Sequence, residues 1–257
     1  MILVLAGTRD GRELAVKLAE AGCRVVVSVI SEYGRCLAEH PQVSVRVGAL
    51  DEAGLCSLIQ SDEIRYLLDA SHPYAAGISS NAMKAAAQTG IVYLRYERPA
   101  TPLPDYDRLY VVPDAQQAAR QAAQLGETVF LTTGSRTLAA FKDEPALHNH
   151  RIIARVLPEP AVIQECVELG FKPSDIIAAQ GPFNLEINIA MLRFFGADVI
   201  VTKNGGEVGG SDAKVDAAIH LGLPLVMIEK PEIHYPCIFT SIEGVLNFFK
   251  EELTCNI

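Results

Sequence analysis

Short runs of β-branched and other apolar residues alternate with longer amphipathic stretches along the whole chain. Such runs are typical of strands that are buried on both faces of a parallel sheet. The stretches between them place Ala and Leu at helical spacing, as expected of helices that pack against a sheet. The pattern therefore predicts an α/β fold built from strands and helices in alternation.

The alternation occurs twice and predicts two sets of elements. In the first half, strands are expected at 2–5, 24–29, 43–46, 66–69 and 92–95, with helices at 11–21, 52–60 and 77–89. In the second half, strands are expected at 109–112, 128–132, 151–156, 175–179, 198–202 and 224–228, with helices at 115–125, 135–141, 161–168, 185–195, 213–221 and 242–252.

A proline-rich interval separates the two halves. It contains Pro99, Pro102 and Pro104 and has little periodicity, which favours an inter-domain linker. We therefore expect an N-terminal domain of the doubly wound type at 1–96, a linker at 97–108 and a C-terminal domain of the same type at 109–257. Both are expected to be open parallel sheets that face a central cleft.

Composition and charge exclude several classes of protein. The net charge of −9, from 22 basic and 31 acidic residues, disfavours a general nucleic-acid binder. An anionic small substrate is still compatible, because a local basic cleft can exist in an acidic protein. No apolar stretch approaches the length of a membrane span, and the scattered cysteines show no metal-ligand spacing. We expect a cytoplasmic protein without a metal site.

The turn after the first expected strand reads Gly7-Thr8-Arg9-Asp10. The N–H groups at the start of the following helix can hold an anion, and Asp10 could cap that helix. The turn is not the GxGxxG of dinucleotide-binding domains, so a plain strand-to-helix turn is the competing interpretation.

Polar and aromatic residues follow the fourth expected strand, where Ser71, His72 and Tyr74 flank Pro73. His72 could transfer protons near neutral pH, and Tyr74 could stack on a flat ligand or donate a hydrogen bond. Alternatively, His72 and Tyr74 only shape the turn around the proline.

In the second half, an apolar strand is followed by Thr133-Gly134-Ser135-Arg136 at the start of a helix. Hydroxyl groups, a glycine and an arginine at a helix start can bind an oxyanion or a phosphate. Arg155 ends the next strand, and a buried guanidinium needs a partner. That partner is either an acidic ligand or a neighbouring Asp or Glu.

Two further turns contain unusual residues. Gly181-Pro182-Phe183 precedes Asn184, a candidate helix N-cap, and is interpreted as a ligand contact. A loop with four glycines, which include Gly209 and Gly210, lies between Lys203 and Lys214 and could wrap a phosphate or carboxylate, although a mobile surface loop is the alternative.

Five basic residues are thus expected to converge on one edge in a chain that is acidic overall. This concentration indicates a polyanionic ligand, but it does not name a reaction. The residues are Arg9, Arg136, Arg155, Lys203 and Lys214.

The five motifs together resemble the precorrin-6A reductase family of cobalamin biosynthesis. The resemblance runs in order from Met1 to about Pro231, although Asn204-Gly205-Gly206 departs from the family's pattern. Its residues are Gly7-Thr8 with Glu13, Asp69 to Tyr74, Thr133-Gly134, Gln180 to Phe183, and Thr202-Lys203 with Gly209-Gly210 and Lys214.

The resemblance implies two Rossmann-like domains and reduction of one double bond of an anionic tetrapyrrole by NADPH or NADH. Hydride would pass to ring carbon C19 and a proton to C18, and the substrate would be precorrin-6A or its cobalt complex. On the matching positions we expect catalytic roles for Tyr74, His72 and Lys203. We expect cofactor binding by Gly7, Thr8, Arg9, Thr133, Gly134, Ser135, Arg136, Gly181, Pro182 and Phe183, and substrate binding by Ser71, Arg155, Gly209, Gly210 and Lys214.

Two alternatives remain at this point. One is a different nicotinamide-dependent enzyme that acts on a smaller acid. The other is a nucleotide- or tetrapyrrole-binding regulatory module without turnover.

Overall fold

The chain forms two compact α/β units. The computed structural model describes residues 1–99, 102–103, 105–204 and 211–255. The first unit comprises Met1–Pro99 and Pro231–Ile257, and the second comprises Ala100–Lys230. The chain therefore enters the first unit, passes through the second and returns to the first.

The first unit is built on a sheet in which every strand pairing is parallel. The strand order is β12-β5-β4-β1-β2-β3. The bounds are β1 Ile2–Leu5, β2 Val25–Val29, β3 Val43–Val47, β4 Tyr66–Asp69, β5 Val92–Tyr96 and β12 Ile238–Phe239.

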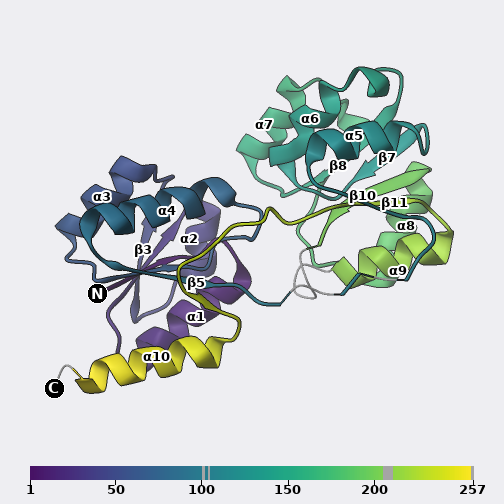
Figure 1. Cartoon of the computed structure of the whole chain (residues 1–257). Helices are drawn as coiled ribbons and strands as arrows, with labels where there is room; N and C mark the ends of the chain where they lie inside the picture. Colours follow the sequence, from purple (N-terminus) through teal and green to yellow (C-terminus); the bar gives the residue numbers. More distant parts are fainter. Residues whose placement is uncertain (100–101, 104, 205–210, 256–257) are drawn as a thin grey trace. The chain divides into compact units, whose positions relative to one another are not determined.

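Helices cover both faces of this sheet (Figure 1). Leu14 of α1 and Phe249 of α10 are buried in a core with Val4 and Val27, whereas Leu55 of α3 packs in a separate core on the other face. The bounds are α1 Arg9–Glu20, α2 Glu32–Ala38, α3 Glu52–Ser61, α4 Ala76–Thr89 and α10 Ile242–Cys255.

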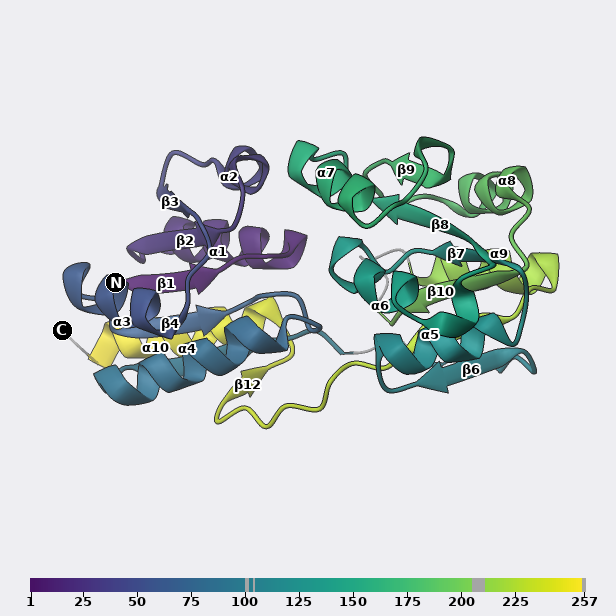
Figure 2. The same cartoon turned by 90° about the horizontal axis from the view of Figure 1, so that it is seen from above.

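The second unit has a parallel sheet of corresponding topology, with the order β6-β11-β10-β7-β8-β9. Figure 2 shows β8, β7 and β10 side by side. The bounds are β6 Leu109–Val112, β7 Thr128–Leu131, β8 Arg151–Val156, β9 Ile176–Ala178, β10 Val199–Lys203 and β11 Leu225–Ile228.

The helices of the second unit also lie on both faces, with α5, α6 and α7 on one side and α8 and α9 on the other (Figure 1). Leu192 of α8 and Ala217 of α9 share a core with Phe130 and Ile200 of the sheet. The bounds are α5 Ala115–Ala123, α6 Leu138–Lys142, α7 Pro160–Glu168, α8 Leu185–Phe195 and α9 Ser211–Leu221, with short 3-10 turns at Ser135–Thr137, Pro145–Leu147 and Pro173–Asp175.

The α/β class and the parallel sheets are confirmed, and one domain boundary is corrected. The sequence assigned 231–257 to the C-terminal domain, but β12 extends the sheet of the first unit beside β5, and α10 packs on that sheet. The break between Pro99 and Ala100 falls within the expected linker. The central cleft between the domains stays a prediction.

None of the helices in the described part of the chain is long and apolar enough to cross a bilayer.

Candidate functional site

In both sheets the chain order reverses beside a central strand. After β3 the chain returns to form β4 on the other side of β1, and after β9 it returns to form β10 on the other side of β7. Ligands of open parallel sheets bind at the carboxyl ends of strands at such a reversal. The ends of β1 and β4, and those of β7 and β10, are therefore the positions at which a ligand is expected.

In the second unit, hydrogen bonds join the carboxyl ends of β7 and β10, the two strands at which the chain order reverses. The Nζ of Lys203, the last residue of β10, donates to the carbonyl oxygen of Thr133 at 2.8 Å. The Oγ1 of Thr132 donates to the carbonyl oxygen of Val201 at 3.0 Å. The predicted residues Lys203 and Thr133 therefore lie together.

The turn after β7 depends on a glycine. Gly134 has φ 79° and ψ 178°, a conformation that is essentially restricted to glycine. Ser135 and Arg136 follow in a 3-10 turn, so the helix expected from Ser135 becomes α-helical only at Leu138. The Oγ1 of Thr137 donates to the Oγ1 of Thr133 at 2.7 Å and ties the turn to the strand end.

Arg155 of β8 is buried, with 8% of its surface exposed. Its Nη1 donates to the Oδ1 of Asn188 at 2.8 Å, and the guanidinium carbon lies 4.9 Å from the ring centroid of Phe183. No ion pair joins Arg155 to a carboxylate of the described residues. Burial lowers the pKa of Arg155 to about 10. The expected alternative, a neighbouring Asp or Glu, is therefore absent from the described part of the chain.

Two lysines, Lys203 and Lys214, add positive charge near Arg155. Burial lowers the pKa of Lys214 on α9 to about 8, and the positive charges of Arg155 and Lys203 add to that shift. Burial, together with the charge of Arg136, lowers the pKa of Lys203 to about 8. Four of the predicted cations therefore act on one another at the carboxyl edge of the second sheet. We call Arg136, Arg155, Lys203 and Lys214 the basic edge.

The fifth predicted cation, Arg9, lies in the first unit at the start of α1 and is exposed. Thr8 caps this helix, because its Oγ1 accepts a hydrogen bond from the Gly11 N–H at 3.0 Å. The expected cap, Asp10, instead forms an ion pair with Arg98. Thr8 Oγ1 also donates to the carbonyl oxygen of Ala70 at 3.3 Å, which places the turn after β1 beside the turn after β4.

Asp69 and Ser71 belong to a buried polar network under the turn after β4. Asp69 pairs with Arg95 at 2.9 Å and accepts hydrogen bonds from the hydroxyls of Tyr93 at 2.8 Å and Ser79 at 2.6 Å. The Oγ of Ser71 accepts from Arg95 Nη1 at 3.2 Å. Ser71 thus contributes to the support of the turn, and its expected contact with substrate stays a prediction.

His72 is exposed and Tyr74 is half-buried on the same turn. Their rings lie 5.6 Å apart, and His72 Nδ1 accepts a hydrogen bond from the Tyr74 N–H at 3.3 Å. The two candidate catalytic side chains of the first unit are thus neighbours. Lys203, the third candidate, belongs to the second unit.

The turn from Gly181 to Phe183 contains a cis peptide bond between Gly181 and Pro182. It contacts the basic edge through the ring of Phe183, which lies against Arg155. Asn184 caps α8, as predicted, by accepting from the Ile187 N–H. Gly209 and Gly210 lie outside the described residues.

Sequence reasoning gave no role to several residues that support these turns. Asn188, which is 2% exposed, joins Arg155 to the turn at Phe183, since its Nδ2 donates to the Phe183 carbonyl at 3.1 Å. Arg95 and Glu97 form the second ion pair of the buried network, at 2.7 Å. One signal in the sequence could have identified such a residue, because a charged residue within an apolar run, such as Arg95 in β5, indicates a buried charge that needs partners.

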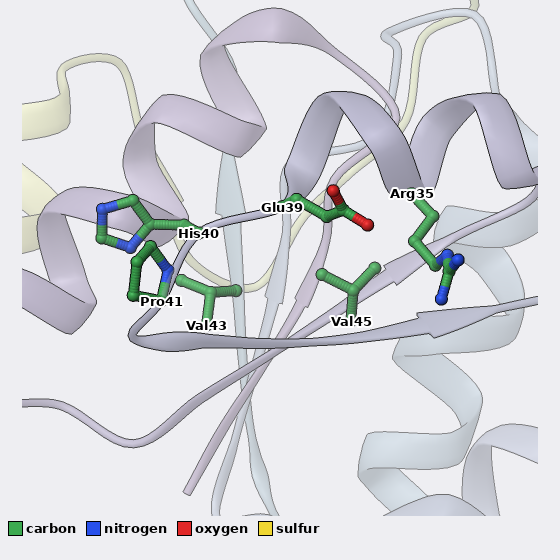
Figure 3. A pocket seen from close by; sticks show the side chains of 6 residues that line it. All are labelled: Arg35, Glu39, His40, Pro41, Val43 and Val45. Carbon is green, nitrogen blue, oxygen red and sulfur yellow. The ribbon is translucent and has the colours of Figure 1, made fainter.

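Two surface hollows lie away from these residues. One, of about 410 Å³, lies between the end of α2 and β3 and is lined by Arg35, Glu39, His40, Pro41, Val43 and Val45 (Figure 3). The other, of about 470 Å³, lies beside Glu127 and Asp198, which precede β7 and β10. Neither includes a predicted site residue. Within the described residues, no group of His, Cys, Asp or Glu is placed to hold a metal ion.

Comparison with known proteins places the chain among enzymes of corrin synthesis. The family model "Precorrin-6x reductase CbiJ/CobK" matches residues 1–250. A cobalt-precorrin-6A reductase of Priestia megaterium is 39% identical over 248 residues, which cover 96% of this chain and 97% of that protein. A precorrin-6A reductase of Rhodococcus erythropolis is 35% identical, with 90% of each chain covered.

A solved structure agrees with these matches. A CobK precorrin-6A reductase has a TM-score of 0.78 and 30% identity, with 97% of this chain and 96% of that chain covered. The family match thus extends over the motifs of both units. Taken together, the sheets, the residues at their carboxyl ends and these matches show that the chain belongs to the precorrin-6x reductase CbiJ/CobK family.

Proposed function

We propose that this chain reduces precorrin-6A, or its cobalt complex, with a nicotinamide nucleotide, NADPH or NADH. Family membership and the named activities of the relatives support the reaction. The observation that carries the proposal for this chain is Arg155, a buried cation whose described contacts are all with neutral groups, at the carboxyl edge of a parallel sheet. A carboxylate of the macrocycle is a fitting partner for such a group.

The proposed reaction adds a hydride to C19 and a proton to C18 and yields precorrin-6B or its cobalt complex. The nicotinamide, when bound, supplies the hydride and is oxidised. The protein therefore has to bind and orient the nucleotide and the macrocycle and to supply the proton. Arg155 and Lys214, with Gly209, Gly210 and Ser71, are the proposed substrate contacts. Tyr74, His72 and Lys203 are the candidates for the proton donor.

The residues at two strand ends fit a nucleotide. The turn at Gly7, Thr8 and Arg9 leads into α1, whose first N–H groups can donate hydrogen bonds to a phosphate next to the exposed guanidinium of Arg9. Thr133 to Arg136 and Gly181 to Phe183 are the other proposed cofactor contacts. A cytoplasmic location remains the prediction from the sequence.

The test of the reaction uses the purified chain with NADPH or NADH and enzymatically prepared precorrin-6A or its cobalt complex, without oxygen. We expect nucleotide oxidation in step with a spectral change of the macrocycle. Binding of either ligand without oxidation would instead indicate a regulatory module. Oxidation only with small acids would indicate a different reductase.

The proton donor is tested by Tyr74→Phe and Lys203→Met. Loss of a general acid should lower kcat by about 100-fold or more, whereas loss of a binding contact should mainly raise KM. The variant that lowers kcat identifies the donor. If neither does, His72 or a bound water takes this role, and His72→Gln separates these two.

A further inference from the structure

Arg155 is held by neutral groups alone among the described residues. Its Nη1 donates to Asn188 Oδ1 at 2.8 Å and lies 3.7 Å from the Sδ of Met191. The guanidinium carbon lies 4.9 Å from the ring centroid of Phe183 and 5.9 Å from that of Phe130. Nη1 thus donates to an amide oxygen and to a thioether sulfur, and two rings pack against the guanidinium, but none of these groups neutralises its charge.

The first unit contains a buried arginine that is neutralised by carboxylates, as buried charges usually are. Arg95 is fully buried and pairs with two carboxylates, Asp69 at 2.9 Å and Glu97 at 2.7 Å. A buried charge without such a pair is unfavourable, and the described residues give Arg155 none, so a bound anion would be a favourable partner for it. Arg95 is therefore neutralised by carboxylates of its own unit, whereas no carboxylate of the described residues neutralises Arg155.

Asn188 is fixed by hydrogen bonds on both sides of its amide. Its Nδ2 donates to the carbonyl oxygens of Phe183 at 3.1 Å and Asn184 at 2.8 Å, which orients Oδ1 toward Arg155. A carboxylate at this position would face those two carbonyls with an acceptor. The neutral amide therefore satisfies the turn and the guanidinium at once.

We propose that Asn188 and Met191 of α8 are positioning residues that aim the Arg155 guanidinium while leaving its charge uncompensated for a carboxylate of the tetrapyrrole. This inference rests on the proposed function, because it assigns Arg155 to the substrate. The neutrality of the α8 face thereby becomes a determinant of affinity for the anionic macrocycle.

Met191 provides a matched pair of variants. Met191→Glu places a carboxylate of similar length beside Arg155, and Met191→Gln is its neutral control. An internal ion pair should compete with the substrate carboxylate. We expect Met191→Glu to raise KM for precorrin-6A or its cobalt complex roughly tenfold or more, with kcat nearly unchanged, relative to Met191→Gln. Asn188→Ala should also raise KM more than it lowers kcat.

Direct binding separates this inference from the proposed reaction. The probe is uroporphyrin, a stable tetrapyrrole octacarboxylate, titrated by calorimetry into the full-length wild-type chain and both Met191 variants. We expect Met191→Glu to bind about tenfold or more weakly than Met191→Gln, because only the glutamate places a negative charge beside Arg155. Without ligand, Met191→Glu should also have a higher Tm than Met191→Gln, because it neutralises Arg155.

Equal binding by the two variants, or equal loss in both, would overturn the positioning role. If uroporphyrin binding follows the charge at position 191 but the wild-type chain oxidises no nucleotide, the anion contact stands and the proposed reaction fails. If turnover occurs but the variants do not differ in KM or binding, the reaction stands and this inference fails.

Discussion

Single side chains in the second unit concentrate positive charge within a chain whose net charge is −9. Lys203 and Lys214 each have a pKa lowered to about 8, chiefly through burial, and the neighbouring cations add to the shift. A bound anion would stabilise the protonated form of each lysine and would raise both pKa values towards their ordinary range. The basic edge is therefore arranged to be more favourable with an anionic ligand than without one.

The titration of these lysines predicts opposite pH trends for folding and for binding. Because the folded-state pKa of Lys214 lies near 8, below the ordinary 10.5, the unfolded chain binds more protons between these values. The destabilisation is fully present below about pH 8 and is relieved as pH rises towards 10.5. The free energy of unfolding should thus rise over this window through Lys214, while the affinity for an anionic tetrapyrrole should fall.

Urea unfolding of the wild-type chain and Lys214→Met at several pH values checks this prediction. The variant should show a weaker rise of the unfolding free energy between pH 8 and 10.5. Lys84→Met is the matched control, since the Lys84 side chain is 60% exposed in the first unit. Identical pH profiles of all three proteins would contradict the assignment of a buried, charged Lys214.

The sequence predicted which strand ends contain the unusual residues but not which of them interact. Lys203, Thr133, Arg155 and Phe183 do lie at neighbouring turns, as the parallel arrangement required. The partner of Arg155 could not be predicted, because it depends on how α8 packs against β8. For the same reason the network of Ser71 with Arg95 was not foreseen, since these residues lie far apart in the chain.

At the scale of elements, the close approach of α1 to the loop after β4 positions the two turns of the first unit. A Cβ on Gly11 would lie 2.9 Å from the Ala70 carbonyl oxygen and 3.0 Å from the Ala70 Cβ. Because backbone is involved, the contact cannot be relieved by a side-chain rotation. A glycine is therefore required for Thr8 to reach Ala70.

Gly11→Ala should lower the free energy of unfolding by about 1–3 kcal/mol through overpacking, as measured by urea denaturation. Gly77→Ala in α4 is the control, since nothing lies within 4 Å of its added Cβ. It should be neutral or stabilise by up to about 1 kcal/mol, since alanine favours helix. Equal stability of the two variants would show that α1 has room at this contact.

The elements themselves were largely predictable, with informative exceptions. The central strands are apolar on both faces, and β1 and β4 have the predicted bounds. The helix α2, with Gly34 inside it, was missed because it is short and has only Ala38 buried. The two-residue strand β12 was missed because its pairing with β5 is set by distant residues and not by local pattern.

At the scale of the whole molecule, the first unit is completed by residues that follow the second unit in sequence. Phe249 of α10 is 3% exposed and packs in the core with Leu14 and Val27. The sequence could not predict this return, because nothing in a local pattern indicates which sheet a final helix covers. The stability of the first unit therefore depends on the end of the chain.

Phe249→Ala should destabilise the first unit by about 3–5 kcal/mol through loss of buried surface and the cavity that remains. Limited proteolysis with mass spectrometry should then find new cleavage within 1–99 and 231–257 before any within 105–204. Phe194→Ala is the control, since Phe194 is 83% exposed, and it should leave the cleavage pattern unchanged. Equal cleavage of both units in Phe249→Ala would contradict the assignment of α10 to the first unit alone.

The most direct test of the proposed reaction is transfer of label from the nucleotide to the macrocycle. The wild-type chain is incubated without oxygen with precorrin-6A, or its cobalt complex, and NADPH or NADH dideuterated at the nicotinamide C4. We expect each reduced macrocycle to acquire one deuterium, at C19, for each nucleotide oxidised. A reduced macrocycle without deuterium, or nucleotide oxidation that leaves the macrocycle unchanged, would contradict it.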